Sequence, residues 1–573
     1  MSRRSAPERY NQRRLGLLSD ERQISGVNRS GVFETALVSP SVYRVGMSLL
    51  GFHVMLRQLS TWPDTVCERS FYPEPDELNW RKRTGRPMVT LESGRSIAGF
   101  DLIIFCVSSV PEFIRLLEMM KLSGMELRGA RRRTTWPLVA CCGLPTTANP
   151  LPLAPFMDFF IVGETEPSLG PVLDTIKSLG TQGAPKHVLL DRVAELPGLY
   201  VPAIHGRERP GVTIMRQWAM AEALRGQAVY ITRNCALCGR VVIETARGCP
   251  FNCRFCLEGY IHLPYRERKA EEVLASLEPI DSALPLALTA NSPLVYAGLK
   301  EVMEVCCAEG RHASITSLRA DRARAISGSR EGAEEGVLVL FPEVGTDGLR
   351  RVIGKKLTNE EIIGQVVKAD ASGLKRLQLS FSIGMPFETD EDREAIASLV
   401  EEIRTHTKAP IDIHFSNFIP RPWTAFQWMP MVRPQILRKR AREVEQRLRR
   451  IRKVACSFAE ARESQIEALL ARGDCRAGLA VHKMLEGLSW TASFAEVGVS
   501  MDWVFERMEP TVQFPWDFLN MGFGHTRLAR ELGSAISANI QRHRKDVPPP
   551  EEEDLPEEDE DGDDDDGDED FDE

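Results

Sequence analysis

The stretch Glu244-Thr-Ala-Arg-Gly-Cys-Pro-Phe-Asn-Cys-Arg-Phe-Cys-Leu-Glu258 decides how the rest of the chain is interpreted. It holds Cys249, Cys253 and Cys256 in a C-x3-C-x2-C spacing. The apolar run 241–243 just before it predicts a buried β-strand, which a glycine and a proline then turn into a loop. Three thiolates in so short a loop can hold one face of an iron–sulfur cube. The fourth iron is then left without a protein ligand.

Two other arrangements could contain three cysteines in one loop. A structural zinc site needs a fourth ligand at a matched spacing, and none follows in this stretch. Three buried free thiols are the other alternative, but the strand-then-loop context and the spacing both favour a metal cluster. An open metal position is where substrate or cofactor chemistry takes place, as in catalytic zinc sites.

The loop resembles the cluster-binding loop of the radical S-adenosylmethionine (SAM) superfamily. The resemblance implies a [4Fe–4S] cluster on Cys249, Cys253 and Cys256, with SAM chelating the open iron and being cleaved to a 5′-deoxyadenosyl radical. Phe255 also fits, since the family places an aromatic ring there beside the adenine. The protein would then supply binding, orientation and exclusion of water.

Length and composition bound the class of protein. A chain of 573 residues predicts three to four domains, and 43% hydrophobic residues suffice for several cores. No apolar run approaches a membrane span, and the basic, polar N-terminus lacks the apolar region of a secretory signal. Thirteen cysteines, an odd number, favour a reducing compartment, so we expect a cytoplasmic protein with no membrane partner.

The net charge of −9 conceals a basic body. Residues 551–573 contain 18 acidic and no basic side chains. The remaining 550 residues carry 72 basic against 63 acidic side chains, a net charge of +9. We expect a disordered acidic tail over 546–573 and a flexible basic arm over 1–30.

The stretch 31–200 predicts a parallel sheet covered by helices on both faces, a Rossmann-like domain. Ligands of such a sheet lie beyond the carboxyl ends of its strands. The ranges expected to form its strands are Glu34–Ser39, Phe100–Val107, Trp136–Cys142 and Met157–Val162, with a helix over Val110–Leu122.

This half resembles the cobalamin-binding domain that precedes many radical SAM domains, and residues 31–535 resemble a poorly characterised group with that arrangement. The matching landmarks are Tyr43–Ser48, Phe100–Ile104, Asn149–Pro152, Phe159–Gly163 and Trp516–Asn520. The D-x-H-x-x-G motif whose histidine ligates cobalt is absent, because neither His53 nor His205 has the required neighbours. Cobalamin is therefore a candidate cofactor, and a scaffold without cobalamin is the alternative.

Residues 201–240 are expected to link the two halves. They contain Cys235 and Cys238 in a C-x-x-C pair. Free thiols are the favoured interpretation; a metal site would need a second pair, such as 141–142 or 306–307, to meet it in space.

The stretch 241–430 predicts a six-stranded partial (β/α) barrel of the radical SAM type. Catalytic groups then belong at the carboxyl ends of the strands. The expected strands are Val241–Glu244, Leu284–Thr289, Ala313–Thr316, Val337–Pro342, Arg376–Phe381 and Ile411–Phe418.

Polar residues or glycines follow these strands, and the resemblance implies that several of them bind SAM. The acidic residue that the family often has after the second strand is missing here. The candidate cofactor-binding residues are Phe255, Thr289, Asn291, Ser292, Ser317, Arg319, Glu343, Gly345, Gly384 and Pro386.

Beyond the barrel we expect a helical region over 431–545. The aromatic stretch 417–428 either lines a substrate mouth or, as favoured, seals the barrel end. A helix predicted over Arg433–Lys453 carries ten basic residues against Glu443 and Glu445, which makes it a candidate nucleic-acid contact.

Three functions fit these observations. The first is a radical SAM enzyme that modifies a nucleic-acid or nucleic-acid-associated substrate, with cobalamin-dependent methylation as one form. The second is a radical SAM enzyme that acts on a peptide or small molecule without cobalamin. The third is a non-enzymatic iron–sulfur protein. Either enzyme would need a reductant such as flavodoxin or ferredoxin; the catalytic residues, the substrate and the oligomeric state are not predicted.

Overall fold

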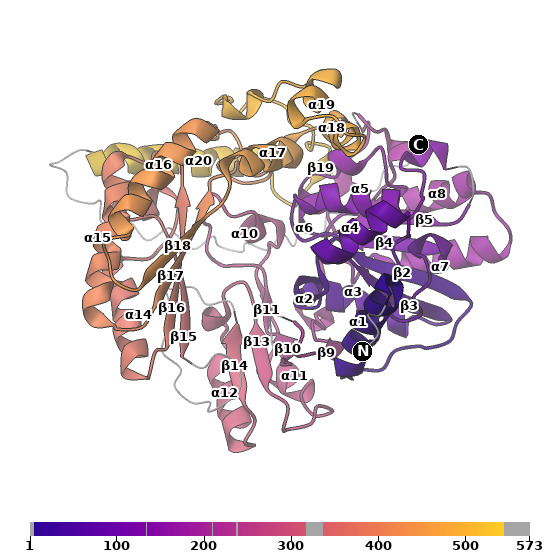
Figure 1. Cartoon of the computed structure of the whole chain (residues 1–573), viewed down its shortest axis with the longest axis horizontal. Helices are drawn as coiled ribbons and strands as arrows, with labels where there is room; N and C mark the ends of the chain where they lie inside the picture. The colour runs from indigo at the N-terminus through magenta and orange to yellow at the C-terminus, as the bar shows by residue number, and fades with distance from the viewer. Residues whose placement is uncertain (1–4, 133–134, 209, 236–238, 317–335, 544–573) are drawn as a thin grey trace, which may run out of the picture.

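The computed structural model describes residues 5–132, 135–208, 210–235, 239–316 and 336–543, and the acidic tail lies outside them. Two α/β halves lie side by side, with helix α10 (Leu257–Ile261) drawn between them (Figure 1). One apolar cluster continues through both halves, from Phe105 and Phe156 to Phe381 and Trp428. None of the described helices is both long and apolar enough to cross a membrane.

The N-terminal half is built on a six-stranded sheet of order β3-β2-β4-β5-β6-β7, in which only β7 is antiparallel. Counted from β2, its first five strands have the 2-1-3-4-5 order of doubly wound folds that bind ligands at the switch point. The Rossmann-like prediction is confirmed, with β3 and β7 as strands that the sequence pattern missed. The bounds are β2 Phe33–Ser39, β3 Thr65–Phe71, β4 Leu102–Cys106, β5 Leu138–Cys142, β6 Phe159–Ile161 and β7 Leu199–Tyr200.

Helices cover both faces of this sheet because its strands are apolar on both sides. Ile103 and Phe105 pack on one face with α5, while Leu102 and Ile104 pack on the other with α3, α7 and α8. Such continuous apolar strands are typical of buried parallel sheets. The helices of this half are α2 Tyr43–Gly46, α3 Leu50–Thr61, α4 Pro75–Thr84, α5 Glu112–Leu122, α6 Leu144–Ala148, α7 Leu169–Thr181 and α8 Lys186–Ala194.

The expectation of a flexible arm is wrong for most of the N-terminal segment. Residues Ala6–Asp20 form helix α1, which begins with a capping box at Ser5 and buries Tyr10. Arg13 pairs with Asp76 of α4 at 3.0 Å, so the basic side chains hold the helix against the domain. Strand β1 (Arg22–Gln23) then pairs with β9 (Tyr230–Ile231) of the linker.

The linker region is short of regular structure and is tied to both halves. Strand β8 (Ile214–Met215) pairs with β19 (Leu519–Asn520) near the end of the described chain. Residue Gln227 forms an antiparallel bridge with Ile243, which covers the outer edge of β10. Among the linker residues that the structure describes, α9 (Pro202–His205) is the one α-helix.

The two parallel sheets of the second half contain all six predicted barrel strands and one more. Strands β10, β13 and β14 form one parallel sheet, and β15 to β18 form another. The additional strand, β18, falls in the stretch predicted to be helical. The bounds are β10 Val241–Glu244, β13 Leu286–Thr289, β14 Ala313–Thr316, β15 Val337–Glu343, β16 Arg376–Ile383, β17 Ile411–Asn417 and β18 Val454–Phe458; the short pair β11 Ala246–Arg247 and β12 Arg266–Glu267 follows β10.

Helices between these strands cover the outside of the barrel, and the last helices join the halves. The side-chain amide of Asn149 donates to the carbonyls of Ala471 (3.0 Å) and Gly473 (2.8 Å), which docks the C-terminal region on the first domain. The helices are α11 Ala270–Ala275, α12 Leu299–Ala308, α13 Asp347–Val352, α14 Asn359–Ala371, α15 Asp390–His406, α16 Pro434–Leu448, α17 Ala461–Arg472, α18 Cys475–Leu485, α19 Trp490–Glu496 and α20 His525–His543.

Candidate functional site

The cysteine loop follows β11 and turns sharply at Gly248. This glycine has a φ of +88°, and a Cβ there would lie 2.5 Å from the carbonyl oxygen of His262. Only glycine combines this left-handed backbone with so close an approach. The turn therefore sends Cys249 directly into the space between the loop and β13.

The three thiols share one buried neighbourhood. Cys249 and Cys253 are buried, and the pKa of Cys256 is raised to about 12 by burial first and then by Cys253, Glu258 and Cys249. No group of three metal-ligating side chains converges on a single ion among the residues that the structure describes. Cysteines that each bind a different iron of a cube need not converge on one point, so this donor set fits a cluster better than one metal ion.

The back of the loop is fixed by Arg254. Its guanidinium donates to the carbonyls of Arg351 (3.0 Å) and Val352 (2.9 Å) at the end of α13, and it pairs with Glu531 of α20 at 3.2 Å. Its backbone N–H donates to Ile353 at 2.9 Å. The loop is thus held against two helices from later in the chain.

The carboxyl end of β13 lies against the thiols, as predicted for Asn291 and Ser292. The hydroxyl of Ser292 lies 3.3 Å from the sulfur of Cys249, and the amide of Asn291 donates to Glu258 at 2.5 Å. Thr289 reaches the loop through its backbone, where its carbonyl accepts from the N–H of Thr245 at 2.9 Å. Apart from Phe255 within the loop, Asn291 and Ser292 are the predicted SAM-binding residues whose side chains contact this stretch.

A second polar group lies across the ends of β15, β16 and β17. Glu343 has a φ of +65°, a left-handed conformation that is uncommon for glutamate and is found mainly at functional sites. Its carboxylate lies 3.4 Å from the ammonium of Lys355 and accepts from Ser382 at 3.2 Å. The hydroxyl of Ser382 in turn lies 2.8 Å from that of Ser416. The sequence pattern singled out Glu343 but missed its partners.

Gly345 and Gly384 lie where an added side chain would meet a neighbouring helix, and the SAM-binding role expected for them stays a prediction. A Cβ at Gly345 would lie 2.4 Å from the carbonyl oxygen of Asp392 on α15. Gly384 has a φ of +81°, and its Cβ would lie 2.9 Å from Leu437 of α16. Both glycines face helices on the outside of the barrel, and Pro386 is buried in the same turn.

The remaining predicted residues differ in where they lie. Phe255 is half-buried beside the thiols and packs against the main core. Ser317 and Arg319 lie outside the described residues. The aromatic stretch 417–428 seals the barrel end, as favoured: Trp423 and Trp428 are buried, and the Trp423 indole N–H donates to Ala148 of the first domain.

An ionic hub that the sequence pattern missed lies behind the cysteine loop. Glu164, which is 6% exposed after β6, accepts from Arg266 at 2.7 and 2.9 Å and from the N–H of Ala219 at 2.7 Å. Arg247 joins it at 3.1 Å and also contacts Glu244 at 2.7 Å. A charged residue just beyond a buried strand was the available signal, since such a residue needs a partner to be buried.

The histidines do not fit cobalt ligation of the base-off type. His53 is fully enclosed: its Nε2 lies 3.0 Å from the carbonyl of Met47, and its Nδ1 accepts from the N–H of Val229 at 3.2 Å. His205 accepts from Val201 at 3.1 Å, and its ring stacks on Tyr200. Cobalamin with a histidine ligand is therefore not supported by either residue.

The cysteines of the linker do not form a described metal site. Cys235 is buried, and its thiol donates to the carbonyl of Thr232 at 3.2 Å. Its expected partner Cys238 lies outside the described residues. Residues 141–142 belong to β5 and residues 306–307 to α12, in different parts of the fold.

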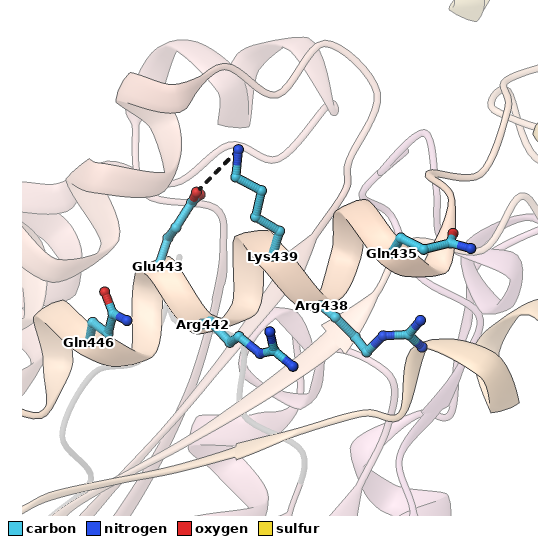
Figure 2. Close-up of a pocket in the computed structure, with 6 residues that line it drawn as sticks. All are labelled: Gln435, Arg438, Lys439, Arg442, Glu443 and Gln446. Atoms are coloured by element: carbon cyan, nitrogen blue, oxygen red, sulfur yellow. Dashed lines mark ion pairs between the residues drawn. The ribbon is translucent and has the colours of Figure 1, made fainter.

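Several charges of the basic stretch Arg433–Lys453 are used in ion pairs, and its helix ends at Leu448. Arg440 pairs with the buried carboxylate of Glu388 at 3.0 Å, and Arg447 pairs with Glu394 of α15 at 2.5 Å. Figure 2 shows the exposed side of α16, where a depression of about 440 Å³ lies beside Arg438 and Arg442, and Lys439 reaches back to Glu443.

Comparisons with known proteins identify both halves. Residues 51–202 match the family described as radical SAM proteins, N-terminal, and residues 243–400 match the radical SAM superfamily. The uncharacterized protein MJ0966 of Methanocaldococcus jannaschii is 24% identical over 397 residues, which are 68% of this chain and 78% of that protein.

Solved structures give weaker likenesses. The cobalamin-dependent SAM radical enzyme OxsB with aqua-cobalamin and SAM bound has a TM-score of 0.42 at 12% identity, over 89% of this chain and 79% of that one. OxsB with aqua-cobalamin has a TM-score of 0.41 at 14% identity, over 66% of this chain and about half (53%) of that one. Streptococcus suis SuiB bound to precursor peptide SuiA has a TM-score of 0.26 at 13% identity, over 39% and 49%. These scores carry no argument about ligands. The family matches cover both the cysteine loop and the sheet that precedes it, and the chain belongs to the radical SAM superfamily.

Proposed function

We propose that this radical SAM enzyme holds a [4Fe–4S] cluster on Cys249, Cys253 and Cys256 and binds SAM between this loop and the ends of β13 and β15. The observation that carries the proposal is the 3.3 Å contact between Cys249 and Ser292, because it brings a predicted SAM residue to a predicted cluster ligand. The cluster, when bound, supplies the electron that cleaves SAM to a 5′-deoxyadenosyl radical.

The chain's own residues have distinct parts in this proposal. Asn291 and Ser292 offer an amide and a hydroxyl beside Glu258 and Cys249, and these groups would suit the amino and carboxylate groups of SAM. Glu343 offers a carboxylate on the opposite strand, held by Lys355 and Ser382. Phe255 supplies an apolar ring for the adenine. A reductant such as flavodoxin or ferredoxin would deliver the electron.

Anaerobic reconstitution tests the assignment. We expect one four-iron cluster per chain, and 5′-deoxyadenosine when the reduced protein receives SAM. The Cys249→Ala, Cys253→Ala, Cys256→Ala triple variant should lose the iron and the EPR signal. If that variant kept both, the cluster would be elsewhere, with Cys235 and Cys238 as the next candidates. A cluster without 5′-deoxyadenosine would indicate a non-enzymatic iron–sulfur protein.

Methylation or a related group transfer is the finer proposal for the net reaction. A methyl transfer would release S-adenosylhomocysteine alongside 5′-deoxyadenosine, whereas other radical modifications release 5′-deoxyadenosine alone. Because neither His53 nor His205 fits as a cobalt ligand, a cobalamin-dependent form would need a corrinoid without a histidine from these positions. The corrinoid content after reconstitution, measured by visible absorption, distinguishes a cobalamin-dependent enzyme from one that works without cobalamin.

Nucleic acid and a smaller substrate are both candidates, and the position of α16 favours the smaller one. The helix lies on the outside of the barrel, and Lys453 follows it at the amino end of β17, where its carbonyl accepts from Ile411. A helix of 15 residues is about 22 Å long, so the basic residues 449–453 lie far from the carboxyl ends where the cysteines are. A peptide or small molecule can reach the loop without touching this region. Crosslinking the reconstituted protein in cell extract would identify what it holds.

A further inference from the structure

We propose that a cavity in the N-terminal half, apart from the cysteine loop, binds an aromatic anion of nucleotide size. The cavity has a volume of about 680 Å³ and is enclosed by α1, α4, the start of α2 and the segment 86–96. Neither the cysteine loop nor the strand ends around it contribute to its lining. The proposal is therefore independent of the SAM site.

The walls of the cavity offer aromatic surface. Tyr10 of α1 and Trp80 of α4 have ring centroids 4.9 Å apart at an interplanar angle of 40°, so they form a wedge instead of a closed stack. Phe71 and Tyr72, at the end of β3, line the same space. Flat aromatic rings prefer offset or tilted contacts with such side chains, which suits a nucleobase or another planar ring system.

Two arginines in the lining have no role in holding the fold. Arg44 and Arg86 are exposed, and neither guanidinium has an ion pair or hydrogen bond to the described residues. By contrast, Arg14 donates to the carbonyls of Leu91 (2.6 Å) and Glu92 (2.9 Å). Free guanidinium groups bind carboxylates and phosphates through paired hydrogen bonds.

The charge of the lining sets how anionic the ligand can be. Arg13 and Arg81 are paired with Asp76 and Glu77. Glu74 also lines the cavity and offsets one of the free arginines. One phosphate or carboxylate group is therefore expected, since several negative charges would be repelled by Glu74.

A buried ion-pair cluster contacts the lining residues Tyr43 and Leu91 and holds this wall of the cavity in place. Arg69 is 1% exposed and pairs with Glu21 at 2.7 Å and Glu92 at 2.6 Å. The hydroxyl of Tyr43 donates to Glu21 at 2.7 Å, which fixes the start of α2 beside Arg44. A site whose walls are already fixed loses less entropy on binding than one that must be ordered.

Binding of AMP to the full-length protein, with saturating SAM present to occupy the cluster site, tests the proposal. We expect AMP to bind, with adenosine and inorganic phosphate each at least about tenfold weaker, since each offers only half of the contacts. The Arg44→Gln, Arg86→Gln double variant should weaken AMP at least about tenfold and leave adenosine unchanged. Arg83→Gln, on α4 but outside the lining of the cavity, should change nothing.

Three results would overturn the inference. One is the absence of AMP binding at about 1 mM, a concentration at which even a weak site is half filled. Another is equal binding by wild type and the double variant, which would place the nucleotide elsewhere. The third is phosphate binding as tightly as AMP, which would show a cationic surface without an aromatic site. Equal melting temperatures of the variants and the wild type serve as the control for folding.

Discussion

The carboxylate of Glu164 lies 3.1 Å from the guanidinium of Arg247, and this contact joins the first domain to the residue just before Gly248. Arg266 holds the same carboxylate from the other strand of the β11–β12 pair. Through this hub the N-terminal domain braces the backbone that presents Cys249. A buried charge of this kind stabilises the fold only while its partners remain in place.

Replacing Glu164 with glutamine should destabilise the protein, because Arg247 and Arg266 would keep their charges without it. We expect a loss of about 3 kcal/mol in the free energy of unfolding, measured by urea titration. Glu195→Gln is the matched control. Its pair with Arg192 is exposed, and its loss should cost less than about 1 kcal/mol. Equal effects of the two changes would refute the bracing role.

The ion pairs of Glu164 predict that the stability of the folded protein depends on pH. Burial opposes ionisation of Glu164, but the nearby imidazole of His262, the hydrogen bonds from Arg266 and the charge of Arg247 outweigh it, so its pKa lies well below the ordinary value. A depressed pKa in the folded state stabilises the protein above the unfolded value of about 4.3. This stabilisation is lost as pH falls toward the folded pKa. The stability difference between wild type and Glu164→Gln should therefore shrink from about pH 6 to about pH 3.

Glu343→Gln should weaken SAM binding about tenfold with little change in the backbone, because glutamine keeps the shape and loses the charge. Equilibrium dialysis with labelled SAM measures this. Lys355 is buried, so a parallel melting curve must separate a binding defect from the cost of an unpaired ammonium. Unchanged affinity would remove Glu343 from the site.

Gly384→Val should act on folding, not on SAM. Its Cβ would meet Leu437, and valine is strained at a φ of +81°. We expect a fall of several degrees in melting temperature, corresponding to more than about 1 kcal/mol. The SAM affinity of the fraction that remains folded should be unchanged. A selective loss of SAM binding at unchanged melting temperature would support the SAM-binding role predicted for this glycine.

Sequence patterns predicted what depends on local order and missed what depends on distant contacts. The strands 241–244 and 313–316 were placed with their observed bounds, because continuous apolar runs between turn residues identify buried strands. Strand β18 was missed because Val454–Phe458 follows a basic helix with no turn signal, and only its pairing with β17 makes it a strand. Helix α1 was mistaken for an arm because its polar surface conceals a single buried residue, Tyr10.

The candidate site likewise contains residues that local sequence predicts and residues that only distant contacts reveal. Ser292 could be named because it follows a strand whose neighbours in a parallel barrel end at the same edge. The positions of Gly345 and Gly384 were found, but a glycine required by a helix behind it looks the same in sequence as one required by a ligand. Lys355 has no local signal, since its partner Glu343 lies on another element. The place of Glu164 just after a buried strand predicts that it has a partner but does not identify Arg247 or Arg266.

The acidic stretch 551–573 is a candidate competitor of nucleic acid for the basic stretch 433–453. If the 18 acidic side chains compete with a nucleic acid for α16, truncation after Pro550 should tighten RNA binding at low salt. The gain should fade as the screening length falls to about 8 Å near physiological ionic strength. Charge reversal should use Arg438, Arg442 and Arg449, which are exposed. Arg440 is unsuitable, because a glutamate there would face the buried Glu388 and perturb the fold. Reversal of these charges should abolish the gain in RNA binding. Equal RNA binding by truncated and full-length protein at every salt concentration would rule out competition. If neither protein bound RNA, a peptide or small-molecule substrate would be the proposal to pursue.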